Sequence, residues 1–274
     1  MITCRIDLPY VDENKTVRFV FTSCQHFGSR GFHRVRFRNF LAEELNHPQT
    51  YLILMGDIFD AIIPSDGKRF DPAEIDPKYL KDNPSMMLNH AINDCTAEVL
   101  PYKDQLLGIV MGNHEYQYLR RYGMNLTQIM CDRLECKNLG MSFLMKVLLK
   151  RNGISEKVRS FVIYGHHGFG GGSRTEGGGL TKYERVVKQY DADIFCFGHD
   201  HDTWSKRIPR LGININGNIV DKSLMMLCCG TFKKSLSDNE IPTWEESKGF
   251  GPKNLGGRVV TVTVKGNGWV DIED

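Results

Sequence analysis

Short runs of apolar residues, each closed by glycine or polar residues, divide the chain into segments that predict buried strands. The runs cover residues 17–21, 51–55, 106–111, 141–150, 157–164 and 192–197. Runs of this length that are rich in β-branched and aromatic residues are typical of strands. The dipeptide Asn152-Gly153 between the fourth and fifth runs predicts a hairpin turn.

Between these runs, apolar residues recur at helical spacing. Phe37, Phe40, Leu41 and Leu45 predict one amphipathic helix that stops at His47-Pro48. Further helices are predicted over residues 84–100, 116–136 and 181–190. Asn83 and Pro84 would begin the first of these, and the capping box Thr181 to Glu184 would begin the last.

The remaining segments lack a regular apolar pattern. Residues 62–84 are rich in Pro, Asp and Lys, which predicts an excursion over the surface. After His201 the pattern changes to short strands, predicted at 204–208, 218–220, 223–229 and, as a pair, at 258–264 and 269–272. Residues 233–257 are predicted to form a long polar loop.

Composition and charge narrow the class of protein. The chain has 274 residues, of which 41% are hydrophobic and 25% charged, enough for one large α/β domain or two small ones. The formal net charge of +2 implies neither a nucleic-acid nor a membrane partner, so only a local patch could argue for either. No signal peptide or membrane span is apparent, and the eight cysteines lack regular spacing. These features predict reduced thiols and a cytoplasmic protein without a membrane partner.

Side chains suited to metal binding or acid-base chemistry follow five of the predicted strands. The five motifs are Cys24-x-His26, Gly56-Asp57-x-x-Asp60, Gly112-Asn113-His114-Glu115, Gly165-His166 and Gly198-His199-x-His201. The loops at the carboxyl ends of strands in an α/β sheet meet at one crevice. Alternate residues of extended backbone also point the same way, so His199 and His201 can converge. The motifs therefore predict one shared metal site.

In order, residue types and strand-end placement, these motifs resemble those of the calcineurin-like metallophosphoesterases, from about Arg18 to His201. The resemblance implies an α/β (α+β) fold, a four-layer αββα sandwich of two packed mixed β-sheets, in one domain over residues 1–274. It also implies two divalent transition-metal ions. Ligation by histidine and carboxylate suits Mn, Fe or Zn better than Mg or Ca.

The resemblance also implies a role for each motif residue. The expected metal ligands are Cys24, His26, Asp57, Asn113, His166, His199 and His201, with Asp57 bridging the two ions. His114 is the expected catalytic histidine, and Asp60 is the acid expected to orient it. Asn113 is also expected to contact the substrate. His167, next to His166, is expected to lie behind the ligands or at the surface.

Position 24 departs from the family pattern, in which the first motif is Asp-x-His. A Cys24 thiolate would replace the hard carboxylate and favour the softer Zn or Fe. Alternatively, Cys24 is only a small buried residue, and that site is weakened or vacant, so that one ion binds instead of two.

Two basic features bear on the substrate. Arg174, within the glycine-rich residues 170–179, is expected to bind substrate phosphate. Arg30, Arg34, Arg36 and Arg38 form either a solvated helix face or a track for a nucleic-acid backbone. The expected function is hydrolysis of a phosphomonoester or phosphodiester by in-line attack of metal-activated water, with a slight preference for nucleic acids or nucleotides. The alternative is a catalytically weakened scaffold of the same fold that binds a protein partner.

Overall fold

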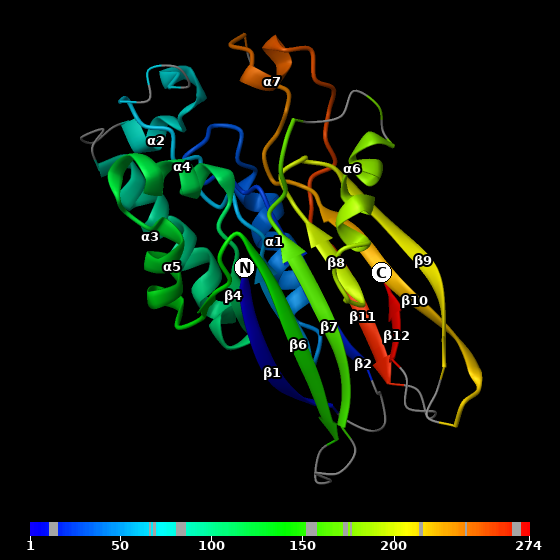
Figure 1. The fold of residues 1–274 in the computed structure, drawn as a ribbon. Helices are drawn as coiled ribbons and strands as arrows, with labels where there is room; N and C mark the ends of the chain where they lie inside the picture. The colour runs from blue at the N-terminus through cyan, green and yellow to red at the C-terminus, as the bar shows by residue number, and fades with distance from the viewer. Residues whose placement is uncertain are drawn as a thin grey trace.

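The computed structural model describes residues 1–10, 16–65, 67, 70–80, 86–151, 158–171, 175, 177–213, 216–238, 240–264 and 270–274. Asn83, Pro84, the Asn152-Gly153 turn and Arg174 lie outside these residues. The described part of the chain contains two six-stranded mixed sheets that pack face to face (Figure 1).

The first sheet combines the N-terminal strand with five strands from residues 142–229, and the last two of these form a long hairpin. Its strand order is β1 (Ile2–Tyr10), β6 (Ser142–Arg151), β7 (Val158–His166), β8 (Ile194–Phe197), β10 (Ile219–Cys229) and β9 (Thr203–Ile213). The pairs β6–β7 and β10–β9 are antiparallel, and the other three pairs are parallel. Strands β7 and β8 therefore end at the same edge of the sheet.

The second sheet carries the first three motifs. Its strand order is β12 (Val270–Glu273), β11 (Arg258–Val264), β2 (Thr16–Thr22), β3 (Thr50–Leu54), β4 (Leu106–Ile109) and β5 (Lys137–Asn138). Strands β2 to β5 run parallel to one another, whereas β11 is antiparallel to β2 and to β12. The loops after β2, β3 and β4 consequently meet at one edge.

The two sheets bury alternate residues of their strands against each other. In β2, Val17, Phe19 and Phe21 belong to the core between the sheets, whereas Val20 belongs to the core on the helical side. The Phe19 ring meets the edge of the Phe161 ring from β7 at a centroid distance of 5.5 Å. This period of two explains why a continuous apolar run forms a strand covered on both faces.

Helices cover the outer faces of both sheets (Figure 1). The helices α1 (Arg34–Leu45), α3 (Met87–Val99) and α5 (Leu126–Leu134) supply residues to the core beside the second sheet. The helix α6 (Gly178–Val187) covers the first sheet, where Tyr183 stacks on Phe197 at 4.1 Å. The predicted four-layer αββα sandwich is thus confirmed.

Short elements complete the described fold. They are η1 (Pro72–Glu74), α2 (Pro77–Leu80), η3 (Leu100–Gln105), α4 (Asn113–Tyr122) and α7 (Trp244–Ser247). The first two fall within the predicted excursion, and α7 falls within the predicted polar loop. None of the helices in the described residues is long and apolar enough to cross a membrane.

Three predicted elements have different limits in the structure. The helix predicted over 116–136 is two helices, because Gly123 ends α4 in the left-handed conformation and the Asn125 side chain caps α5. The prediction that a capping box at Thr181 begins a helix is wrong, because α6 begins at Gly178, three residues earlier. The strands predicted at 204–208, 218–220 and 223–229 form the two eleven-residue strands of one hairpin, β9 and β10, whereas the predicted pair at 258–264 and 269–272 corresponds to β11 and β12.

Candidate metal centre

Backbone hydrogen bonds hold the first two motif loops together. The amide of Cys24 donates to the carbonyl of Gly56 at 3.0 Å, and that of His26 donates to Asp57 at 3.1 Å. Two donors from the loop after β10, the Thr231 hydroxyl and the Phe232 amide, then bind the carbonyl of Cys24. Backbone contacts among three loops therefore fix where these side chains point.

One group of possible ligands comprises Cys24, His26 and His201. One atom of each, the thiol sulfur or a ring nitrogen, lies within 4.8 Å of the others. The two Nε2 atoms of His26 and His201 are 3.1 Å apart. All three side chains come from strand ends whose convergence was predicted from the sequence.

The second group comprises Asp57, Asn113, His167 and His199. The Nε2 atom of His167 lies 3.1 Å from Asp57 Oδ2 and 3.1 Å from Asn113 Oδ1. The Nδ1 atom of His199 lies 2.7 Å from the same Asn113 oxygen. Cys24 adjoins this group as well, because its sulfur is within 4.8 Å of ligand atoms of Asp57 and His167. The fully buried Cys24 therefore lies beside both groups.

The structure brings His167 to this position in place of the expected His166. The backbone of β7 stays extended to His166, so consecutive side chains there point to opposite sides. The His166 ring turns toward Phe169, and its Nδ1 accepts the amide hydrogen of Gly168 at 2.8 Å. His167 is fully buried instead of lying behind the ligands or at the surface. Both expectations for this pair are corrected accordingly.

This pair of adjacent histidines gives a matched test. We expect His167→Ala to lower affinity for a divalent metal by at least about 100-fold, because it removes a group that contacts Asp57 and Asn113. His166→Ala should change that affinity less than about threefold. Isothermal titration of each metal-free variant with Zn²⁺ or Mn²⁺ measures the difference. Equal losses in the two variants would contradict the assignment of His167.

The buried imidazoles donate one ring N–H to an oxygen and turn the other nitrogen toward the centre. His167 Nδ1 lies 2.7 Å from the Met55 carbonyl, and His199 Nε2 lies 2.7 Å from the Gly170 carbonyl. Carbonyl oxygens only accept, so these nitrogens carry the hydrogens. In the neutral rings, the nitrogens that face Asn113 are then acceptors too. A divalent metal ion among these acceptors would satisfy several of them at once.

The ionisation of the buried groups agrees with this need for a cation. Burial lowers the pKa of His201, and the adjacent His26 lowers it further, so the ring stays neutral and one of its two nitrogens keeps a lone pair for a metal ion. Burial opposes ionisation of Asp57, but the neighbouring His167 and His114 outweigh it and hold the pKa of Asp57 well below its usual value. Burial and Asp57 raise the pKa of the Cys24 thiol. This donor set fits divalent transition metals.

Asp60 lies between two histidines and does not orient His114 in the expected way. Its carboxylate is 3.2 Å from His26 Nδ1 but 3.9 Å from His114 Nδ1. The backbone carbonyl of Asp60, rather than its side chain, contacts the Nδ1 atom of His114. Asp60 therefore positions His26 through its carboxylate and His114 through its main chain.

Glu115, for which no role was predicted from the sequence, connects the loops of the centre. Its buried carboxylate accepts the amide hydrogens of Asp57, Phe59 and Gly112 at 3.1, 2.9 and 2.9 Å. A Cβ atom at Gly112 would collide with Asp57, so only glycine allows the two loops to approach this closely. The one sign of this role in the sequence is that Glu115 directly follows His114 in the third motif.

The backbone at the centre is strained. Among the side chains of the two groups, those of Cys24, His26, Asp57, His199 and His201 stand on backbone with positive φ angles, at values from 51° to 71°. Left-handed backbone costs energy for residues with a Cβ atom and is often found at functional sites. Five of the candidate ligands therefore adopt conformations that the surrounding fold must impose.

The arginines after the first motif are engaged within the protein. Arg34 contacts Asp94 at 2.6 Å and Glu98 at 3.2 Å, and Arg38 contacts Glu98 at 2.6 Å. The carboxylates on α3 thus offset the charge of two of the four arginines. This pairing favours a helix face used in packing over a nucleic-acid track.

Comparison with known proteins agrees with the motif set. The family described as "Calcineurin-like phosphoesterase" matches residues 17–203. None of the curated proteins is similar enough to this chain to match.

Several solved structures resemble this chain. GAP50 of Plasmodium has 12% identity over 94% of this chain and 83% of that chain, with a TM-score of 0.46. A metallophosphoesterase from Sphaerobacter thermophilus has 11% identity over 93% and 87%, with a TM-score of 0.34. Chaetomium thermophilum Vps29 has 11% identity over 94% and 95%, with a TM-score of 0.33. These scores are too low to support a function.

Proposed function

The chain belongs to the calcineurin-like phosphoesterase family and is a metal-dependent hydrolase of ester bonds, and we propose that it cleaves phosphomonoesters or phosphodiesters at the centre around Asp57. The family match ends at residue 203 and so includes every motif residue. We base the role of each residue on the arrangement of these side chains in the structure.

The observation that supports the proposal is the convergence of acceptor atoms of Asp57, Asn113, His167 and His199, to which the backbone amide of His114 donates one hydrogen bond, at Asp57 Oδ1. Oxygens of Asp57 and Asn113 lie 3.1 Å from the same nitrogen of His167, whose other nitrogen is bound to the Met55 carbonyl. Such an arrangement is typical of metal-binding histidines oriented by an oxygen partner. A purely structural cluster would contain hydrogen-bond donors to match its acceptors.

We assign the ligands of two divalent transition-metal ions to two groups of residues. Cys24, His26 and His201 would hold one ion, Asn113, His167 and His199 would hold the other, and Asp57 would contact both. When bound, such ions lower the pKa of a coordinated water and offset charge on the phosphoryl group.

His114 is the candidate general acid. It follows Asn113 at the start of α4, and its amide donates to Asp57 Oδ1 at 3.0 Å, which fixes its backbone beside the centre. Its side chain is 16% exposed, whereas that of His26 is 3% exposed, so His114 faces an approaching substrate. Because the Asp60 carbonyl accepts the hydrogen of Nδ1, the proton given to the leaving oxygen would be the one on Nε2 of the protonated ring, which would become neutral.

The proposed substrate class is phosphate esters in general. The pairing of Arg34 and Arg38 with carboxylates removes the main reason to prefer nucleic acids. The remaining candidate from the sequence, Arg174, lies outside the described residues. Substrate preference is therefore best measured first with small phosphate monoesters and diesters.

His114→Ala should reduce kcat by about 10² to 10⁴-fold, because it removes a proton donor without removing a proposed ligand. The measurement is hydrolysis of p-nitrophenyl and bis-p-nitrophenyl phosphate with added Mn²⁺ or Zn²⁺, together with the metal content of each protein. The exposed His47→Ala is the control and should retain full activity. If wild type and His114→Ala are equally inactive with every metal, the scaffold alternative gains instead.

A further inference from the structure

The loop after β10 carries a buried lysine, Lys233. Its Nζ atom lies 3.0 Å from Glu245 Oε1 and 3.6 Å from Glu74 Oε2, and only 10% of its side chain is exposed. Burial opposes the charge of Lys233, but the neighbouring Asp60 and Glu245 outweigh it and hold the pKa of Lys233 above its usual value. Lys233 is therefore a buried ammonium ion beside carboxylates.

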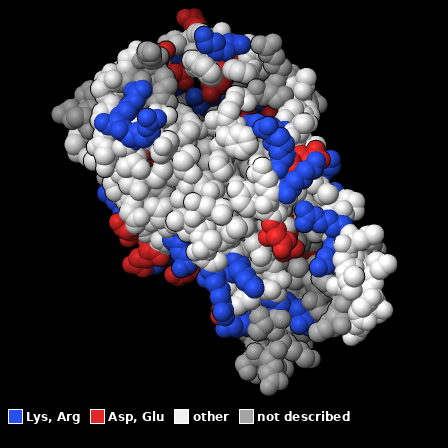
Figure 2. Space-filling view, viewed as in Figure 1, with Lys and Arg blue, Asp and Glu red and all other residues white. Residues whose placement is uncertain are grey.

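The ion pairs of Lys233 join segments that are far apart in the sequence. Glu74 belongs to η1, within the excursion after β3, and Glu245 belongs to α7. Glu74 also accepts the amide hydrogen of Trp244, the first residue of α7, at 2.8 Å. In Figures 1 and 2, acidic and basic side chains meet in the hollow between α7 and α2, the helix after η1. Charged contacts thus connect η1 with α7.

The backbone of Lys233 is attached to the first motif. Its amide donates to the Thr231 hydroxyl at 3.0 Å, and this hydroxyl donates to the carbonyl of Cys24 at 2.9 Å. Lys233 also forms an isolated antiparallel bridge with Phe32, and a Cβ atom on Gly31 would lie 3.0 Å from Lys233 Cγ. These contacts attach Lys233 to the loop of the first motif and to the residues that follow it.

The segment of Glu74 is also bound to the residues just after His26. The amide of Arg30 donates to the carbonyl of Glu74 at 2.8 Å, and the amide of Ser29 donates to the carbonyl of His26 at 2.9 Å. His26 adopts a left-handed backbone conformation, which surrounding contacts must impose. The ion pair between Lys233 and Glu74 strengthens these contacts.

We propose that Lys233 is a positioning residue for the ion at Cys24 and His26, an inference that rests on the ligands assigned under the proposed function. Without the ammonium, Glu74 and Glu245 would be two largely buried carboxylates with no cation between them. Their repulsion would separate η1 from α7 and release the segment after His26. Loss of a partner that orients metal ligands typically lowers metal affinity about 10- to 100-fold.

Other roles of Lys233 fit these observations less well. A lysine that binds substrate phosphate would turn its ammonium toward the solvent, whereas this ammonium faces two carboxylates. A nucleophilic or basic lysine needs a lowered pKa, and the pKa of Lys233 is raised. A charged side chain that holds loops together is the role that remains.

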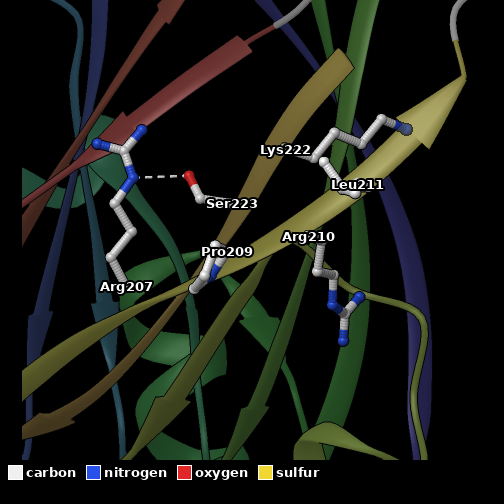
Figure 3. Close-up of a pocket in the computed structure, with 6 residues that line it drawn as sticks. All are labelled: Arg207, Pro209, Arg210, Leu211, Lys222 and Ser223. Carbon is white, nitrogen blue, oxygen red and sulfur yellow. Dashed lines mark hydrogen bonds between the residues drawn. The ribbon is translucent and has the colours of Figure 1, made fainter. Parts of the chain in front are cut away.

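The basic residues of the β9–β10 hairpin are arranged differently. They line a groove of about 600 Å³ (Figure 3). Arg207 on β9 pairs with Asp271 on β12 at 2.5 Å. Burial raises the pKa of Asp193, and the charges of Lys222 and Arg210 oppose this rise. The cations of this groove therefore have partners among the strands, whereas the ion pairs of Lys233 adjoin the first motif.

Titration of the metal-free full chain with Co²⁺ tests the proposal. Wild type should bind two ions, and a cobalt–thiolate absorption in the near ultraviolet identifies the ion at Cys24. Lys233→Met should weaken binding of that ion by at least about tenfold and binding of the other by less than about threefold. Lys234→Met is the matched control, because Lys234 pairs with the exposed Asp238, and it should bind both ions as wild type does.

Two further variants separate the charge of Lys233 from a general loss of folding. Lys233→Arg keeps the cation, so its affinity for the Cys24 ion should be nearer to that of wild type than to that of Lys233→Met. The double variant Lys233→Met and Glu245→Gln removes one of the carboxylates left unpaired. Its affinity for the same ion should recover at least about threefold relative to Lys233→Met. Thermal melts followed by circular dichroism verify that each variant unfolds cooperatively.

The proposal is overturned if Lys233→Met binds the Cys24 ion as tightly as wild type does, if it weakens both ions equally, or if Lys234→Met has the same effect. It is also overturned if the double variant binds no better than Lys233→Met. A wild type that binds two ions without the cobalt–thiolate absorption overturns both this inference and the assignment of Cys24. If wild type binds both ions as expected but does not hydrolyse phosphate esters, the proposed function fails and this inference stands, because these measurements are of binding.

Discussion

Asp57→Asn should lower metal-dependent kcat/KM by at least about 10³-fold, since this substitution keeps the shape of the side chain but removes the negative charge shared by the two proposed ion sites. Asp57 is 2% exposed and contacts His167 through one oxygen and the amide of His114 through the other. An amide cannot offer two anionic oxygens to two ions. The resulting loss of several kcal/mol of transition-state stabilisation corresponds to this change in rate.

Steady-state hydrolysis and metal analysis of purified protein measure this effect together. We expect Asp57→Asn to retain fewer than two ions per chain. Asp200→Asn is a matched control: this buried carboxylate lies between His199 and His201 in sequence but pairs with Lys182 at 2.5 Å. It should keep both ions. Near-normal turnover of Asp57→Asn would show that Asp57 does not bridge two ions.

Cys24→Asp should reverse the metal preference of the enzyme by about tenfold or more, from Zn²⁺ toward Mn²⁺. Cys24 adjoins both proposed ligand groups, and its backbone makes three hydrogen bonds, with Gly56, Thr231 and Phe232. A thiolate favours soft metal ions, and a carboxylate favours harder ones. Competition between Zn²⁺ and Mn²⁺, followed by metal analysis, measures the change.

Cobalt substitution gives a second measurement that does not depend on activity. A cobalt–thiolate bond produces a charge-transfer absorption in the near ultraviolet, which the wild type should show and Cys24→Asp should lack. The control is Cys228→Ser, since Cys228 is another fully buried thiol in the first sheet and should not affect the band. If wild type binds two ions and shows no such band, Cys24 is not a metal ligand.

The sequence was sufficient to predict the strands that carry the motifs, because each is covered on both faces. Val17, Phe19 and Phe21 pack between the sheets, while Val20 packs under the helices, so the run is apolar throughout. The strand β1 was not predicted. It lies at an edge of its sheet, and most of its residues are at least partly exposed, so its apolar signal is weak.

The error at His166 and His167 has a specific physical origin. Which of two adjacent residues faces a site depends on where extended backbone ends, and a shift of one residue reverses the outcome. The sequence shows an apolar run up to Tyr164 but not that β7 extends to His166. The role of Glu115 could not be predicted from the sequence either. It depends on the close approach of Gly112 to Asp57, and these residues are far apart in the sequence.

The hydrogen bond from His199 to the Gly170 carbonyl connects the first residues of the glycine-rich segment to a proposed metal ligand. Gly168 is packed so closely against His199 and Tyr183 that it has no room for a side chain. Thermodynamic linkage then applies in both directions. A change in the backbone at residues 168–171 would therefore alter the affinity for the ion at His199, and binding of that ion would stabilise the contact of His199 with Gly170 by the same free energy.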